Sequence, residues 1–142
     1  MNVVLLRSLS LSLAVLLLCA CGHFLTPKEQ RREKALVLAT DSYRKNMRWG
    51  NFEEAAGYLR AKEGEISGPN MESFSHYKIT GYYTNEQQRN DAGDEVRVVA
   101  HIEYYELDTG VARTLRDDQY WWYDEASQRW YLGSRMPELD KH

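Results

Sequence analysis

Two histidines and a glutamate have side chains of the types that bind metal ions. His76, His101 and Glu103 fall on two segments with the alternating pattern of neighbouring strands, on the face opposite the apolar one. Imidazole nitrogens and carboxylate oxygens are ligands that Zn²⁺ accepts. Two histidines on an exposed sheet face are, however, more often simply solvated. We therefore predict no metal site and no cofactor.

A second group combines carboxylates with guanidinium groups. Asp117 and Asp118 lie close in the sequence to Arg113 and Arg116, and such a group could support general acid–base chemistry. Alternating charges on a strand more often form exposed cross-strand pairs. The chain also lacks a phosphate-binding loop and a nucleophile–histidine motif. We therefore predict no catalytic residue.

The aromatic run Tyr120-Trp121-Trp122-Tyr123 is the clearest candidate for a binding site. Successive side chains of a strand point to opposite faces, so one face of this run belongs to the core and the other faces outward. Exposed aromatic clusters are typical of interfaces, and Tyr105 could extend this one. A helix or the chain end could instead cover the outer face. The predicted surface for a protein, a glycan or a small ligand consists of Tyr120, Trp121, Trp122, Tyr123 and Tyr131.

The elements that position these residues begin with a long helix, predicted from Pro27 to Arg48. Thr26 and Glu29 match a capping box, and Pro27 suits the first helical position. Gly50 favours a left-handed helix end, after which Asn51 could cap a second helix over 52–61. The apolar stripe of the first helix has spacings of three and four and consists of Leu36, Ala39, Tyr43 and Met47.

The period then changes from helical to alternating. Four strands are predicted at 74–84, 95–107, 111–123 and 129–133. In the first, Tyr77, Ile79 and Tyr83 share one face, and Gly81 indicates a bend or bulge. Helices followed by strands predict an α+β fold, with two N-terminal helices packed on a curved four-stranded antiparallel meander.

The N-terminus has the features of an export signal. Arg7 precedes a short apolar stretch over 8–18, which is too short for a comfortable membrane span. The stretch ends in Leu18-Cys19-Ala20-Cys21, which resembles the lipobox of bacterial lipoproteins. The resemblance implies cleavage after Ala20 and lipidation of Cys21. By the same resemblance, Gly22 rather than Asp favours the outer membrane, facing the periplasm, over the inner membrane.

The whole chain is predicted to divide into four parts. Residues 1–20 form the predicted signal peptide, 21–26 the lipidated cysteine and a short tether, 27–134 one domain, and 135–142 a polar tail. Cys19 leaves with the signal, so the mature chain has no thiol left for a disulfide or for nucleophilic catalysis. The formal net charge of −3 for the whole chain, without a basic block, argues against nucleic acid as a partner.

Two segments resemble the nuclear-transport-factor-two-like superfamily, a cystatin-like cone of helices held in a curved sheet. They are Met47–Ala56, where a helix ends at a glycine and another begins, and Asp118–Tyr123 with Arg129–Leu132 after a turn. The resemblance implies a concave sheet that encloses a pocket or forms an interface. Ketosteroid isomerases and scytalone dehydratases of this superfamily place Asp, Tyr or His inside the cone, but no such set maps onto this chain.

These observations favour a membrane-anchored envelope lipoprotein with a non-catalytic binding domain. Its expected contacts are the membrane, through the lipid on Cys21, and an envelope protein or a small ligand. The alternative is a small enzyme or ligand-binding protein that uses the interior of the cone. A deep cavity with converging ionisable groups would favour the alternative, and a filled cone would favour the binding module.

Overall fold

A computed structural model describes residues 25–141 of the chain. The predicted signal peptide, the lipobox, Cys21 and Gly22 lie outside the described residues, so processing and lipidation stay predictions. Within residues 25–141, no helix is long and apolar enough to cross a membrane.

The first helix, α2 (Pro27–Trp49), begins and ends as predicted to within one residue. The Thr26 hydroxyl accepts a hydrogen bond from the Glu29 amide at 3.2 Å, and the Thr26 amide donates to the Glu29 carboxylate at 2.6 Å. At the other end, Gly50 adopts a φ of 80°, which glycine tolerates without strain. The apolar stripe is largely confirmed, because Leu36, Tyr43 and Met47 are buried.

Two short helices follow, α3 (Phe52–Ala56) and α4 (Met71–Phe74). The helix predicted over 52–61 ends early because the next residues pair with the sheet. The Arg60 amide donates to the Leu132 carbonyl at 3.0 Å, and the Leu132 amide donates to the Tyr58 carbonyl at 2.7 Å. The α4 turn lies between the predicted second helix and the first predicted strand, and it includes Phe74, which was predicted to begin that strand.

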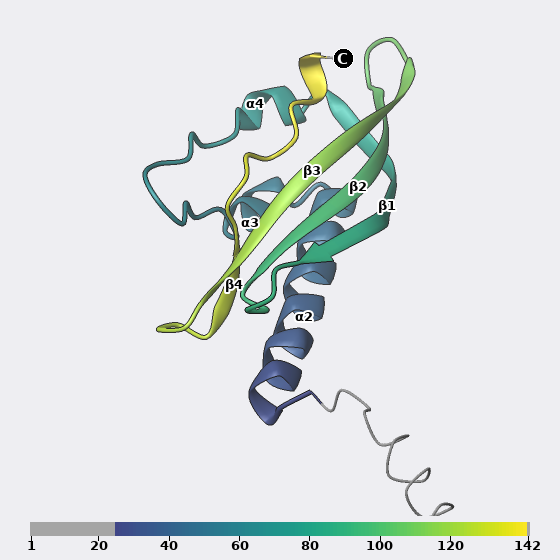
Figure 1. The fold of residues 1–142 in the computed structure, drawn as a ribbon. Coiled ribbons are helices and arrows are strands. Elements are labelled where there is room, and N and C mark those ends of the chain that lie inside the picture. Colours follow the sequence, from purple (N-terminus) through teal and green to yellow (C-terminus); the bar gives the residue numbers. More distant parts are fainter. Residues whose placement is uncertain (1–24, 142) are drawn as a thin grey trace, which may run out of the picture.

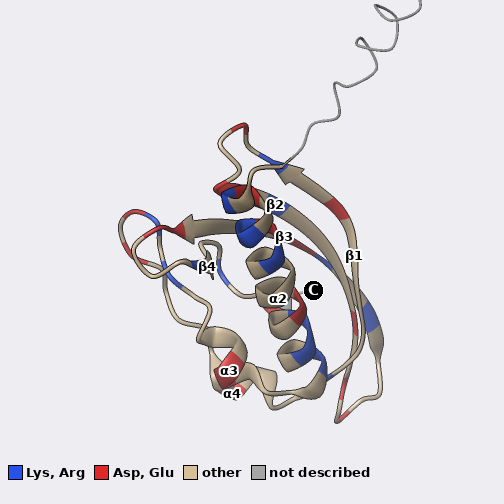
Figure 2. Ribbon diagram, turned by 90° about the horizontal axis from the view of Figure 1, so that it is seen from below, with Lys and Arg blue, Asp and Glu red and all other residues tan. Residues whose placement is uncertain are grey.

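Within residues 25–141, four antiparallel strands form one sheet in the order β1-β2-β3-β4. The sheet curves around α2, which lies in its concave face (Figures 1 and 2). The predicted α+β meander with helices packed on one face is therefore confirmed. The strands are β1 (Tyr77–Arg89), β2 (Glu95–Glu106), β3 (Ala112–Asp124) and β4 (Arg129–Leu132).

A bulge near Gly81 changes the inward face of β1. The register with β2 shifts between Ile79 and Gly81, and an extra residue in one strand reverses the alternation of side chains. As a result Tyr82 is buried, whereas Tyr83 is 53% exposed. The prediction that Tyr83 shares a face with Ile79 is therefore wrong, although the predicted irregularity at Gly81 is present.

The C-terminal segment is part of the domain rather than a polar tail. Met136 and Leu139 are buried in the same core as the α2 stripe. The Tyr104 hydroxyl donates to the Leu139 carbonyl at 3.2 Å, and Leu139 opens a short 3-10 helix, η1 (Leu139–Lys141). The predicted boundary at residue 134 is therefore wrong, because the two apolar side chains close the core beside α4.

Candidate functional site

The predicted aromatic surface is divided between the two faces of β3. Trp121 is fully buried in the core, with its ring 5.6 Å from that of Tyr43 in an edge-on arrangement. Tyr123 lies on the same face and is half-buried under Arg32, whose guanidinium is 5.0 Å from its ring. These two residues face α2, so they cannot belong to an outward surface.

On the outer face, Arg60 covers the remaining aromatic side chains. Its guanidinium lies 4.9 Å from the Tyr131 ring and 5.7 Å from the Trp122 ring. The indole N–H of Trp122 donates to the Arg60 carbonyl at 2.8 Å, and Trp122 is 8% exposed. Tyr120 is half-buried, with its ring against Gly133. The expectation that Trp121 and Trp122 lie on a binding surface is therefore wrong, because one is core and Arg60 covers the other.

The two histidines considered as metal ligands, His76 and His101, share no interaction partner among the described residues. His76 is exposed and precedes β1, whereas His101 lies on the outer face of β2 with its Nδ1 2.8 Å from the Asn85 side-chain nitrogen. Among residues 25–141 there is no group of three His, Cys, Asp or Glu side chains that could hold a metal ion.

A buried polar network inside the cone was not predicted. Asp117, Gln119 and Trp121 alternate along β3 and so share its inner face. The Gln119 side-chain amide donates to the Asp117 carboxylate at 2.6 Å and also to the Tyr82 hydroxyl. The Trp121 indole N–H donates to the side-chain amide oxygen (Oε1) of Gln119 at 2.9 Å. The neighbouring Tyr43 hydroxyl is buried and has no hydrogen-bond partner within the described part of the chain.

Burial controls the electrostatics of this network. It raises the pKa of Asp117 from 3.8 to about 6, against the hydrogen bond from Gln119, which lowers it. Burial, and secondarily the charge of Asp117, also raise the pKa values of Tyr43 and Tyr82. By contrast, Asp118 is exposed and pairs with Arg116 at 2.8 Å, which lowers its pKa. The predicted exposed cross-strand pairing is therefore wrong for both residues, because Asp118 pairs with Arg116 of its own strand and Asp117 is buried.

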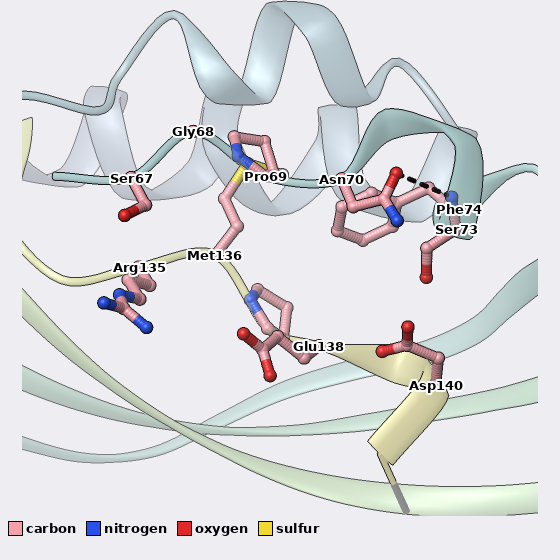
Figure 3. A pocket seen from close by; sticks show the side chains of 11 residues that line it. Ser67, Gly68, Pro69, Asn70, Ser73, Phe74, Arg135, Met136, Glu138 and Asp140 are labelled. Atoms are coloured by element: carbon pink, nitrogen blue, oxygen red, sulfur yellow. Dashed lines mark hydrogen bonds between the residues drawn. The ribbon is translucent and has the colours of Figure 1, made fainter.

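A groove lies between the segment that contains α4 and the C-terminal segment (Figure 3). It has a volume of about 230 Å³. The Asn70 side chain accepts a hydrogen bond from the Ser73 amide at 3.4 Å, which holds one wall. Figure 3 shows Arg135 near one end of the groove and Asp140 near the other. The two segments that form this groove are the loop 67–74 and residues 135–140, and we call it the distal groove.

The distal groove lies at the end of the domain opposite the start of α2 (Figure 1). In Figure 1, α4 and the C-terminus are at the end of the domain opposite the first residues of α2. At the α2 end, acidic and basic residues are interspersed along the ribbon (Figure 2). Lys28 and Arg32 both pair with Glu125, and Arg89 pairs with Glu33. The basic residues at the start of α2 are therefore partly neutralised by the sheet.

Comparisons with known proteins do not assign a family. No protein-family model matches the chain, and a comparison with curated protein sequences gives no match. Among solved structures, the chain is similar to one from Xanthomonas campestris pv. campestris, described as "a putative polyketide cyclase". The two share 12% sequence identity over 80% of this chain and 95% of that chain, with a TM-score of 0.44.

Proposed function

We propose that this protein is a lipid-anchored envelope protein whose domain binds a ligand or partner through its outer surface, without catalysing a reaction. One observation carries the proposal: the concave face of the sheet is filled. Tyr43, Tyr104 and Trp121 occupy it and are at most 1% exposed. A catalytic site requires a cavity into which ionisable groups converge. Here the carboxylate of Asp117 is enclosed by protein atoms and is 7% exposed.

The proposed lipid anchor on Cys21 would place the protein at a membrane surface. Lipid on Cys21 would hold the start of α2 near a membrane surface, because residues 22–25 extend at most about 14 Å. Helix α2 has 23 residues, which corresponds to a length of about 35 Å. The distal groove lies at the opposite end of the domain (Figure 1). It would therefore face away from the membrane and toward soluble or cell-wall components of the envelope.

The anchor is tested by replacing the cysteine. We expect Cys21→Ala to abolish labelling with a radioactive fatty acid and to release the protein from the membrane fraction. Cys19→Ala is the matched control, because alanine is common at that lipobox position and lipidation should persist. Lipid labelling that survives in Cys21→Ala would contradict the proposed anchor.

The binding role is tested by crosslinking in cells. A photoreactive residue at Ser67 or Ser73, on the wall of the distal groove, should give an adduct that depends on irradiation. The control position is Thr114, which is exposed on β3 outside the groove. Failure of both groove positions to give more adduct than Thr114 would contradict binding at this surface.

The alternative, a site inside the cone, is favoured by the Tyr43 hydroxyl, which lies near Asp117 and has no hydrogen-bond partner in the described part of the chain. Such a site requires the packed side chains to move apart. NMR distinguishes the two possibilities. A ligand that enters the cone shifts the signals of the Gln119 side-chain amide and the Trp121 indole N–H, whereas a ligand in the distal groove shifts those of residues 67–74 and 135–140.

A further inference from the structure

The distal groove has a rigid apolar floor. Phe74 is buried and stacks on Phe52, with ring centroids 4.4 Å apart and an interplanar angle of 23°. Met136 and Pro137 are buried on the other side. A site whose floor is locked by core packing loses little entropy when a ligand binds. The groove is therefore preorganised rather than formed by two loose segments.

Polar and charged groups surround this floor in an asymmetric way. Arg135 is exposed at one end, and its guanidinium makes no hydrogen bond or ion pair with any residue in 25–141. At the other end, the carboxylate of Asp140 and the hydroxyl of Ser73 point toward each other across the groove (Figure 3). Glu138 lies between the two ends and already has an interaction of its own, so it is not needed for the assignment.

We propose that the distal groove binds a small zwitterion, which is a free amino acid or a dipeptide. This proposal rests on the proposed binding function. A guanidinium matches a carboxylate through paired hydrogen bonds, so Arg135 binds the carboxylate of the ligand. Asp140, helped by Ser73, accepts hydrogen bonds from its ammonium group. The Asn70 side chain lines the wall between them, where a peptide group would lie.

The size of the groove sets the upper limit of the ligand. Its volume of about 230 Å³ is below the range of about 300–1,000 Å³ that is usual for drug-sized ligands. A single amino acid or a dipeptide fits this limit, and a longer peptide would have to leave the groove at one end. A ligand that carries both charges can pair with Arg135 at one end and Asp140 at the other, whereas a simple anion or a simple cation can pair with only one of these ends.

The test uses the full-length protein in detergent micelles and three probes: Ala-Ala, N-acetyl-Ala-Ala and Ala-Ala-amide. We expect Ala-Ala to shift the backbone amide NMR signals of residues 67–74 and 135–140 with saturation at about 1 mM or below. Each blocked peptide lacks one charge and should bind about tenfold more weakly, since a charge-assisted hydrogen bond is lost. Equal binding of the three probes, or no saturable shift with Ala-Ala, overturns the proposal.

Two variants assign the ends of the ligand. Arg135→Gln should lose the preference for Ala-Ala over Ala-Ala-amide, and Asp140→Asn should lose the preference over N-acetyl-Ala-Ala. Arg31→Gln and Asp91→Asn are matched controls at exposed positions outside the groove, and both should keep the wild-type preferences. Unchanged preferences in Arg135→Gln and Asp140→Asn overturn the assignment. Crosslinking from Ser67 without dipeptide binding would leave the binding function standing and remove only this ligand class.

Discussion

Asp117 is a buried carboxyl group that has no cationic partner within residues 25–141, and this has a measurable consequence for stability. Burial raises its pKa from 3.8 to about 6 in the folded protein. Below 3.8 the group is protonated in both the folded and the unfolded chain. Above about 6 the folded protein must hold a buried charge, which the unfolded chain leaves in water. Stability is therefore lost as the pH rises through this window, by about 3 kcal/mol from a shift of about two pKa units.

Asp117→Asn removes this charge while keeping the size of the side chain. We expect the free energy of unfolding of the variant, relative to the wild type, to rise by about 3 kcal/mol between about pH 4 and pH 8. Comparing the two pH values cancels any pH-independent change in packing caused by the amide. The assay is urea unfolding followed by tryptophan fluorescence at a series of pH values.

The neighbouring residue provides the control. Asp118 is exposed and its pKa is lowered, chiefly by the hydrogen bond from Arg116. Asp118→Asn should therefore show no gain in relative stability as the pH rises. If the difference between Asp117→Asn and the wild type is the same at about pH 4 and pH 8, the carboxyl group is not desolvated and the reasoning is refuted.

Three further predictions concern side-chain packing and hydrogen bonding, and they can be measured by the same unfolding assay. Tyr43→Phe removes a buried hydroxyl that has no partner within the described residues and should stabilise the fold by about 1 kcal/mol, whereas Tyr104→Phe loses the bond to the Leu139 carbonyl and should destabilise it by a similar amount. An equal effect of the two would contradict the difference in hydrogen bonding. Leu139→Ala should lower the free energy of unfolding by about 2–4 kcal/mol, because the C-terminal segment belongs to the core. An effect near zero would show that this segment does not contribute to the core. Gly133→Ala places a Cβ within 2.7 Å of the Tyr120 ring and should cost about 1–3 kcal/mol, unless the ring moves aside freely.

Local chemistry made several elements predictable. The capping box of Thr26 and Glu29 and the left-handed Gly50 depend on residues only a few positions apart, so the ends of α2 could be inferred from the sequence. The same holds for β2, where strict alternation places Val96 and Ile102 in the core. Because each strand follows the previous one through a short turn, the meander order also followed from the sequence.

The errors occur where a distant segment competes with a local preference. The helix predicted over 52–61 stops because the backbone of Tyr58 and Arg60 pairs with Leu132. Tyr83 faces outward because the bulge at Gly81 shifts the register by one residue. Nothing in the local sequence states where these partners lie.

The sequence by itself therefore determined the order of helices and strands, the caps of α2 and the predicted anchor at Cys21. Only the tertiary structure decided that Asp117 is buried while Asp118 is exposed, since both have the same side chain and differ only in the face of β3 that they occupy. It also decided that Arg60 covers Trp122, a contact between residues 62 positions apart. The physical reason is that burial and electrostatics depend on all neighbours in space, whereas a sequence pattern reports only neighbours along the chain.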